Sequence, residues 1–583
     1  MYCIKIGIMA RKPKLIPYFQ LKNVGVFQDK NSQWGINKMI WLIYGCLVVI
    51  CVIYMLRLFQ LTVFKNSFYK KISENNRLKE ILIPAKRGEI TDRNGAKIAY
   101  DVVSSDSGEF VRYYDTGNLW GHIIGYLQKS SKSQYKSDSC QKKLFFDDKS
   151  GQIGIEKAFD CYLRGKKGKM LVEVDANGRT SEIIENLPPI AGEDIQLTIS
   201  KYLQEKIFDL INQNLVESND IADYRNQKIA VIATTPNDGE LLAMLSYPTF
   251  DPNIFTKNDL TSISTLMTDE NRPLFNRATS GEYPPGSVFK PMIAAAALES
   301  GMVKQNELIT DTGEIKVGEQ TFGNWYFQKY GKTEGNIDIV KALQRSNDIF
   351  FYRLGERLGS TKISEWARKF GFGKSSSRLL EDTSGLIPTD FWKKETLKEK
   401  WYQGDNYNTA IGQGYVLTSP LQIHNANQVF ANGGFLCQPK IIKKITSQHL
   451  DQKSKDLLSA GCQKIGLKNS TILAVKNGMG AACTAGGTGY PFFDFKINVK
   501  SANSDSQSSS SATLTKNIQV GCKTGTAQNH LASGKPHAWF SVFAPFENPE
   551  IALTILVEES GEGSNVAAPL AKAILKYYFE NQH

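Results

Sequence analysis

The chain has 583 residues, 41% of them hydrophobic, and its 70 Lys and Arg against 58 Asp and Glu give a formal net charge of +12. This length exceeds one ordinary domain, and the hydrophobic content can fill two or more cores, which excludes a disordered chain. The charge does not indicate a nucleic-acid partner, because residues 1–38 form a basic arm that carries half of it, with seven Lys and Arg against one Asp.

Residues 39–57 are predicted to form a transmembrane signal anchor. MIWLIYGCLVVICVIYML, residues 39–56, has no charge, and at about 1.5 Å per residue its helix approaches the roughly 30 Å thickness of bilayer hydrocarbon. A buried core helix is the alternative, but apolar residues surround the whole helix instead of forming a stripe. The preceding basic arm and the lack of a small-residue cleavage site predict a cytoplasmic N-terminus and an exported, uncleaved remainder.

Residues 58–200 are predicted to form a small, mostly β module with one helix. RGEITDRNGAKIA, residues 87–99, places an Asp-Arg-Asn-Gly turn between two short β-type runs and predicts a hairpin. Residues 128–150 are polar and rich in Ser and Lys, which predicts a loop. GIEKAFDCYLRGKKG, residues 154–168, predicts a helix that ends at Gly165, and strands resume with MLVEVDANGRT.

Residues 225–583 are predicted to form a second, α/β (α+β) domain. KIAVIATTPNDGELLAML, residues 228–245, predicts a hairpin with an Asn-Asp-Gly turn. Helical patterns cover 291–299, 337–358 and 420–432, and strand-like runs cover 517–525, 537–546 and 550–560 before a closing helix at 567–579. Short connections predict an antiparallel sheet covered by helices. The low-complexity run 501–511 is predicted to be a flexible surface loop.

The cysteines do not predict a metal site. None of the six beyond the span shows C-x-x-C spacing, so zinc is not indicated. Cys483 and Cys522 are the preferred disulfide pair because they flank one polar excursion, while free buried thiols remain an equal alternative. The six are Cys140, Cys161, Cys437, Cys462, Cys483 and Cys522.

The stretch GEYPPGSVFKPM, residues 281–292, places Ser287 and Lys290 one helical turn apart. The YPPG turn puts Ser287 at a helix start, and Lys290 then lies on the same face. A serine alcohol becomes a nucleophile when a base takes its proton, and a buried amine can be that base. A Ser N-cap with a chance Lys explains the motif equally well. The same pattern, without a core helix behind it, occurs at Ser67, Ser133 and Ser139.

Two further motifs follow in the chain. SND, residues 346–348, lies on a helix-like segment, where it would ordinarily be a helix start. CKTGTA, residues 522–527, ends a strand with a cation, two hydroxyl groups and a glycine that permits close backbone approach. Each is weak alone, but the order S-x-x-K, S-x-D and K-T-G-T is difficult to obtain by accident.

With these motifs the sequence resembles the class B penicillin-binding proteins from the span to the C-terminus. RGEITDRNGAKIA and GIEKAFDCYLRGKKG resemble the family's pedestal, its dimerisation-like module. GELLAMLSYPTFDPN, NRATSGEYPPGSVFKP, AIGQGYVLTSPLQ and KTGTAQ resemble its penicillin-binding transpeptidase domain. KTGTAQ, HAWF and the Asp of the middle motif are more similar to the elongation type than to the septal type. The short stretch 99–122 implies a reduced pedestal.

The resemblance implies a role for each motif residue in peptidoglycan D,D-transpeptidation. Ser287 would attack the carbonyl between the two terminal D-alanines of a stem peptide, and Lys290 would be the base. Ser346 would relay the proton to the leaving amine, and Lys523 would keep Lys290 neutral. Asp348 stands where Asn is commoner in the family, which leaves open which of the two amines is neutral.

The strand motif would bind the substrate. The hydroxyl groups of Thr524 and Thr526 would bind the substrate carboxylate, with Gly525 allowing close approach. The backbone amides of Ser287 and Thr526 would form the oxyanion hole. No cofactor is implied.

The same chemistry admits two alternatives, a D,D-carboxypeptidase or β-lactam-hydrolysing enzyme, and a β-lactam sensor or scaffold. No residue stands out to activate the water that the hydrolase needs. The implied partners are peptidoglycan stem peptides, β-lactams, the membrane, and a membrane glycosyltransferase of the shape, elongation, division and sporulation family. The span would contact that enzyme, since Gly45 lets another helix approach.

Overall fold

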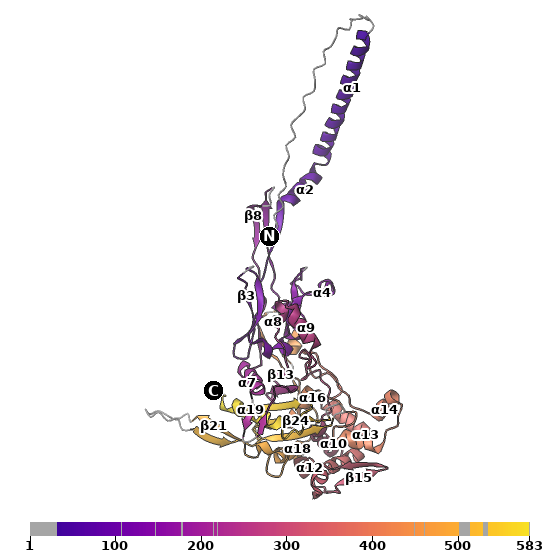
Figure 1. The fold of residues 1–583 in the computed structure, drawn as a ribbon, viewed down its shortest axis with the longest axis vertical. Coiled ribbons are helices and arrows are strands. Elements are labelled where there is room, and N and C mark those ends of the chain that lie inside the picture. The colour runs from indigo at the N-terminus through magenta and orange to yellow at the C-terminus, as the bar shows by residue number, and fades with distance from the viewer. Residues whose placement is uncertain are drawn as a thin grey trace, which may run out of the picture. The chain divides into compact units, whose positions relative to one another are not determined.

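The structure is a computed structural model that describes residues 32–581, except 106–107, 146, 176–178, 214, 218–219, 448, 460, 501–512 and 529–533. The basic arm up to residue 31 and the low-complexity run 501–511 lie outside the described residues. The chain forms two compact units (Figure 1). The first comprises the residues up to Ile81 with Met170–Glu185, and the second comprises Leu82–Lys169 with Asn186–His583.

The first unit contains the predicted span. Helix α1, Ser32–Phe59, continues through the π-helical turn η1, Gln60–Phe64, and is followed by α2, Asn66–Arg77. Residues Asn37–Phe64 are long and apolar enough to cross a membrane, and an 18-residue window within them has a mean hydropathy of 2.6. A three-stranded sheet follows, in the order β1, Leu78–Ile83, β7, Gly168–Val174, and β8, Thr180–Leu187.

The second unit begins with a five-stranded sheet to which both halves of the chain contribute. In spatial order its strands are β19, Ile442–Ile445, β9, Ile195–Leu197, β2, Ile90–Thr91, β3, Lys97–Val103, and β4, Phe110–Tyr114. The antiparallel pairing of β2 with β3 confirms the hairpin predicted at 87–99. In its turn Asp92 accepts hydrogen bonds from the backbone amides of Asn94 and Ala96, both at 2.8 Å.

Two local predictions in this region were wrong in part. The predicted loop 128–150 contains helix α4, Lys132–Ser137, because Ser131 and Gln134 form a capping box. It also contains most of the paired strands β5, Leu127–Lys129, and β6, Lys149–Gly151. The helix predicted at 154–168 breaks at Phe159 into α5, Gly154–Ala158, and α6, Asp160–Leu163, and ends before Gly165.

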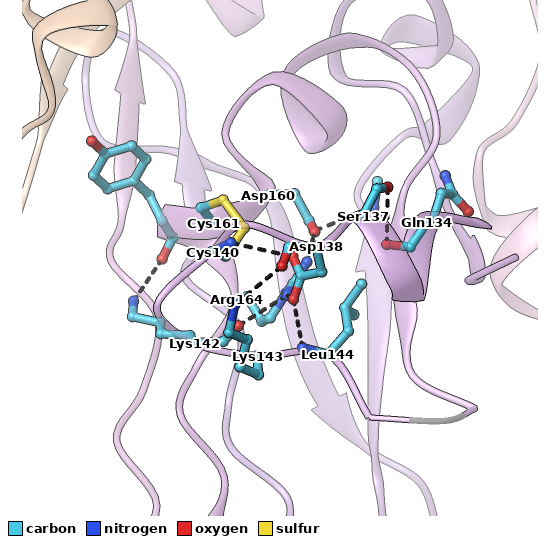
Figure 2. The surroundings of a disulfide bond; sticks show 12 residues. Gln134, Ser137, Asp138, Cys140, Lys142, Lys143, Leu144, Asp160, Cys161 and Arg164 are labelled. Carbon is cyan, nitrogen blue, oxygen red and sulfur yellow. Dashed lines mark hydrogen bonds and ion pairs between the residues drawn. A yellow bond between two sulfur atoms is a disulfide. The ribbon is translucent and has the colours of Figure 1, made fainter. Parts of the chain in front are cut away.

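A disulfide fastens the polar segment after α4 to α6. Figure 2 shows this bond between Cys140 and Cys161 beside the carboxylate of Asp138. Asp138 accepts hydrogen bonds from Arg164 Nη1 at 3.0 Å and from the Leu144 amide at 2.8 Å. One covalent bond and one buried ion pair therefore hold a segment whose composition predicted a loop.

A buried carboxylate anchors the first hairpin to α5. The fully buried Glu156 accepts hydrogen bonds from Arg87 Nε and Arg112 Nε, both at 2.8 Å, and from the Tyr114 hydroxyl at 3.2 Å. Burial by itself raises the pKa of Glu156, but the two guanidinium groups outweigh it and hold the pKa below its ordinary value. Arg87, the first residue of the RGEITDRNG run, therefore stabilises the fold through its ion pair with Glu156.

The five-stranded sheet of the predicted α/β domain is entirely antiparallel, as predicted. Its strands, in spatial order, are β13, Leu241–Tyr247, β12, Ile229–Thr234, β25, Ile551–Val557, β24, His537–Ala544, and β23, Gly521–Ala527. Alternate residues face opposite sides. Val231 and Ile555 pack with α7, Lys201–Asn212, and α19, Ala567–Glu580. Ile232 and Leu556 belong to the core on the other face, which α16, Pro420–Gln428, covers (Figure 1).

The predicted helices and strand runs of this domain are found with shifted ends. The pattern at 291–299 is α10, Lys290–Glu299, and the pattern at 420–432 is α16. The pattern at 337–358 is two helices, α12, Ile339–Arg345, and α13, Asp348–Lys369. The run at 517–525 is divided between β22, Thr513–Asn517, and β23.

The remaining elements are short or peripheral. They are η2 Gly117–Leu119, α3 Gly121–Ile124, β10 Leu215–Glu217, β11 Asp220–Ala222, α8 Asn253–Thr256, α9 Leu260–Thr268, η3 Gly286–Phe289, β14 Ile309–Asp311, β15 Glu314–Val317, β16 Gln320–Gly323, α11 Trp325–Tyr330, β17 Gly335–Ile337, α14 Asp390–Leu397, α15 Gln403–Ala410, β18 Phe435–Cys437, α17 Gln452–Leu458, β20 Cys462–Lys464, α18 Asn469–Ala482, η4 Tyr490–Phe492 and β21 Lys496–Lys500.

All six cysteines beyond the span form disulfides. The preferred pair, Cys483 with Cys522, is confirmed and joins the end of α18 to β23. Cys437 and Cys462 join β18 to β20. The alternative of free thiols is therefore wrong for these residues.

We expect Glu156→Gln to lower the free energy of unfolding by about 3 to 5 kcal/mol, because it leaves two buried guanidinium groups with a neutral partner. Glu381→Gln is the control, since its ion pair with Lys157 at 3.0 Å is exposed and should contribute less than about 1 kcal/mol. Urea unfolding of the detergent-solubilised full chain measures both. Equal losses from the two variants would contradict the structural role of Glu156.

Candidate active site

The segment around Ser287 packs directly against strand β23. Gly286 has a left-handed φ of +57°, and a Cβ on it would lie 3.0 Å from the Thr526 carbonyl oxygen. A Cβ on Gly525 would lie 3.0 Å from Val288 Cγ1 and 3.2 Å from the Pro285 oxygen. Both positions therefore need glycine for the close approach of the two backbones.

Ser287 lies on the 3₁₀ turn η3, directly before α10 begins at Lys290. Its side chain is half-buried, whereas Val288 and Phe289 beneath it are fully buried. Within the described part of the chain, no hydrogen bond reaches the Ser287 hydroxyl. The predicted helix start is confirmed, and the alcohol is open to solvent.

Lys290 is fully buried, and its amine bonds to the middle motif. Lys290 Nζ donates to the Ser346 carbonyl at 2.8 Å and to Asp348 Oδ1 at 2.7 Å, and it lies 3.4 Å from Ser346 Oγ. Burial lowers the pKa of Lys290 below its ordinary value, and the Asp348 carboxylate opposes that change. The amine one turn from Ser287 is thus held by Ser346 and Asp348.

The middle motif lies at a junction between two helices, not inside the helix expected from its pattern. Ser346 ends α12 in a left-handed conformation, with φ 53° and ψ 37°. Asn347 caps α13, accepting a hydrogen bond from the Phe350 amide at 2.9 Å, and Asp348 is the first residue of α13. The break turns the Ser346 hydroxyl toward both lysines, a placement that continuous helix would not give.

Lys523 is the second fully buried amine. Its Nζ donates to Ser346 Oγ at 2.8 Å and to the Thr524 carbonyl at 3.0 Å. Burial, and then the positive charge of Lys290, hold the pKa of Lys523 well below its ordinary value, while Asp348 raises it. The Ser346 hydroxyl therefore lies between two amines whose charged forms are both disfavoured by burial.

Asp348 is held in place by backbone and amide groups. Its Oδ2 accepts from the Trp325 amide at 3.3 Å, and its own amide donates to Asn324 Oδ1 at 3.1 Å. Asn324 and Asn347 both donate to Asp311 Oδ2, at 3.1 and 2.8 Å. The start of a helix also favours a negative charge.

The threonines of the strand motif differ in their surroundings. Thr526 is exposed, and Thr524 is buried and donates a hydrogen bond to Thr488 Oγ1 at 2.7 Å. The structure thus brings all the predicted site residues onto two contacting segments and one helix junction. Three further residues contact the site, namely Asn324, Asp311 and Thr488. They lie in no motif, so the sequence analysis missed them, and no local signal would have found them.

Comparison with known proteins identifies the family. The penicillin binding protein transpeptidase domain matches residues 229–576, and the penicillin-binding protein dimerisation domain matches residues 107–197. The peptidoglycan D,D-transpeptidase MrdA of Haemophilus influenzae is 32% identical over 488 residues, which are 81% of this chain and 70% of that protein. The chain therefore belongs to the class B penicillin-binding proteins and is a serine-type peptidoglycan D,D-transpeptidase, similar to the elongation-type MrdA proteins.

Solved structures agree with this assignment. The structure of Pseudomonas aeruginosa PBP2 in complex with WCK 5153 is 29% identical, with a TM-score of 0.69, and covers 86% of this chain and 98% of that chain. A chain from a peptidoglycan synthase complex, described as coordinating polymerization and crosslinking, is 26% identical with a TM-score of 0.68. That match covers 93% of this chain and 98% of the other.

We expect Asp348→Asn to move the ascending limb of the pH profile for penicillin acylation toward lower pH. The Asn side chain keeps an acceptor for Lys290 but removes the negative charge that raises the pKa of Lys290 and of Lys523. Both pKa values then fall further, so the neutral amine is present at lower pH.

Stopped-flow acylation rates from acid to alkaline pH measure this shift. Asp390→Asn is the matched control, because Asp390 also occupies the first turn of a helix, α14. A limb that stays in place or moves to higher pH would contradict the electrostatic role of Asp348.

Proposed function

We propose that this transpeptidase cross-links stem peptides through an acyl-enzyme on Ser287. The observation that carries the proposal is the contact of the half-buried Ser287 turn with β23, beside two buried lysines that share the Ser346 hydroxyl. A nucleophile, an amine base and a carboxylate-binding strand thereby meet at one place.

The first step forms the acyl-enzyme. Ser287 Oγ attacks the carbonyl between the two terminal D-alanines, and its proton passes to the neutral form of Lys290. The bond to the terminal D-alanine then breaks, and Ser346, 3.4 Å from Lys290 Nζ, relays the proton to the leaving amine. Lys523 lies 2.8 Å from the same hydroxyl, and a charge on either lysine amine disfavours a charge on the other.

Strand β23 orients the substrate. The hydroxyl groups of Thr524 and Thr526 bind the terminal carboxylate, and Gly525 keeps the Ser287 turn close. The amides of Ser287 and Thr526 stabilise the oxyanion, each donor contributing about 3 kcal/mol. An amine of a second stem peptide then takes the acyl group, and a cross-link forms.

A β-lactam that mimics the D-alanyl-D-alanine end would acylate the same serine. A D,D-carboxypeptidase or β-lactam-hydrolysing reaction would instead pass the acyl group to water, and a sensor would retain it. The relatives named as D,D-transpeptidases favour the cross-linking reaction.

We expect Ser287→Ala to abolish covalent labelling by fluorescent penicillin, because no other alcohol replaces the nucleophile. Ser133→Ala is the matched control, since Ser133 also begins an S-x-x-K pattern but is exposed on α4. Gel fluorescence after denaturation measures the covalent adduct. Retained labelling in Ser287→Ala would reject the assignment of the nucleophile.

The products distinguish the transpeptidase from its alternatives. With lipid-linked glycan strands, the wild-type protein should release D-alanine and form cross-linked stem-peptide dimers, and Ser287→Ala should form neither. Mass spectrometry of muramidase digests measures the dimers. Release of D-alanine without dimers would favour the carboxypeptidase.

The proposed partner is a membrane glycosyltransferase of the shape, elongation, division and sporulation family. A class B protein supplies cross-linking only, and the similar chain in a peptidoglycan synthase complex supports this pairing. The apolar helix Asn37–Phe64 is the proposed contact, with Gly45 as a point of close approach. The catalytic domain would then lie outside the cytoplasm, in a single-pass membrane protein.

We expect a variant that carries Ser280→Cys, with Cys3, Cys46 and Cys51 replaced by Ser and the three disulfides kept, to react with a membrane-impermeant maleimide on intact cells, because the positive-inside bias exports the segments after the span. A variant carrying Ser32→Cys, before the span, should react only after the cells are lysed. Labelling of Ser32→Cys on intact cells, with Ser280→Cys protected, would reverse the proposed orientation.

A further inference from the structure

The loop of residues 483–489, between α18 and η4, is attached to strand β23 beside the catalytic residues. Its first residue, Cys483, is disulfide-bonded to Cys522, which directly precedes Lys523. At its end, a Cβ on Gly489 would lie 2.7 Å from Cys522 Sγ and 2.8 Å from Cys483 Sγ. The loop therefore closes against the disulfide at both ends, and only glycine fits at position 489.

The same loop is attached to the middle motif. Arg345, the residue before Ser346, donates from Nη1 to the Gly486 carbonyl at 2.7 Å. The Arg345 side chain is in turn paired with Glu334 at 2.6 Å and lies over the ring of Tyr326. The loop thus connects the residue before Ser346 with the residue before Lys523.

Between these attachments the loop presents one hydroxyl to the strand motif. Thr488 is half-buried, and its Oγ1 accepts the hydrogen bond from Thr524 Oγ1 at 2.7 Å. A hydroxyl group has a single proton to donate and can accept two hydrogen bonds. The Thr524 hydroxyl is therefore fixed in one rotamer, and the Thr488 proton remains for another acceptor.

We propose that Thr488 is a positioning residue for the carboxylate of the substrate or of a β-lactam. When the carboxylate enters, Thr488 donates to Thr524, and Thr524 donates to the carboxylate. Such a chain of hydrogen bonds strengthens the last donor, and the contact with Thr488 holds the Thr524 side chain in place before binding, so that only the hydroxyl protons need to turn. The proposal rests on the proposed function, because it needs Thr524 to bind that carboxylate.

The experiment compares two probes that differ only in the carboxylate, benzylpenicillin and its methyl ester. Thr488→Val removes the hydroxyl at nearly constant shape, and Thr488→Ser keeps it. We expect Thr488→Val to lower the second-order acylation rate constant for benzylpenicillin about 10-fold, the effect of one hydrogen bond to a charged group. The rate constant for the ester should not change, and Thr488→Ser should restore the wild-type ratio.

Two controls separate positioning from a general structural effect. Thr484→Val changes the same loop, but Thr484 donates to the Ala481 carbonyl at 2.9 Å and not to β23, so the ratio of rate constants should stay at its wild-type value. In a Thr524→Val background, Thr488→Val should have no further effect, because it acts through Thr524. Thermal midpoints verify folding, and Thr488→Ala replaces Thr488→Val if the latter is unfolded.

Equal losses with both probes, an unchanged ratio in Thr488→Val, or additive effects with Thr524→Val would overturn the proposal. The measurements on wild-type protein distinguish a failure of this proposal from a failure of the proposed function. If wild-type protein is acylated and prefers benzylpenicillin, but Thr488→Val keeps that preference, only the role of Thr488 is rejected. If wild-type protein is not acylated, or does not prefer the carboxylate-bearing probe, the carboxylate site itself is rejected.

Discussion

The proposed active site depends on two lysine amines that are buried against one serine hydroxyl. Ser346 Oγ lies 2.8 Å from Lys523 Nζ and 3.4 Å from Lys290 Nζ, and among the residues that the structure describes one carboxylate, Asp348, bonds to this pair, through Lys290. In a poorly solvated site, two ammonium groups so close together repel each other more than one carboxylate compensates. The arrangement therefore favours the neutral form of one amine, which is the state that the proposed base for Ser287 requires.

That arrangement constrains the backbone around it. Lys523 and Ser287 belong to segments that pack at backbone distance, and this contact needs glycine at 286 and 525. Ser346 adopts a left-handed conformation that non-glycine residues seldom adopt. Two sets of contacts hold Ser346 in this strained conformation. They are the cap that Asn347 provides for α13 and the hydrogen bonds from Lys290 and Lys523 to Ser346. The site is thus a set of mutually dependent contacts.

The buried charged groups of the chain differ in how fully their partners neutralise them. Glu156 is as deeply buried as Lys290, but two guanidinium groups neutralise it and its pKa falls, so it serves as an anchor. Asp348 compensates the amines of Lys290 and Lys523 only in part, and the pKa values of both lysines fall, which favours their neutral forms. A buried charge with full partners stabilises a fold, whereas a buried charge with too few partners is suited to proton transfer.

The sequence alone determined the apolar helix of the predicted span, the apolar runs that form β12, β24 and β25, the closing helix and the motif residues, because these are local patterns of hydrophobicity and residue type. It also favoured one disulfide, Cys483 with Cys522. The tertiary structure alone decided the break at Ser346, the network of Asp311 and Asn324, the other two disulfides and the contact of Thr488 with Thr524. These features depend on contacts between residues that lie far apart in the chain. The sequence did not predict them because a local pattern does not specify which distant residue a side chain will contact.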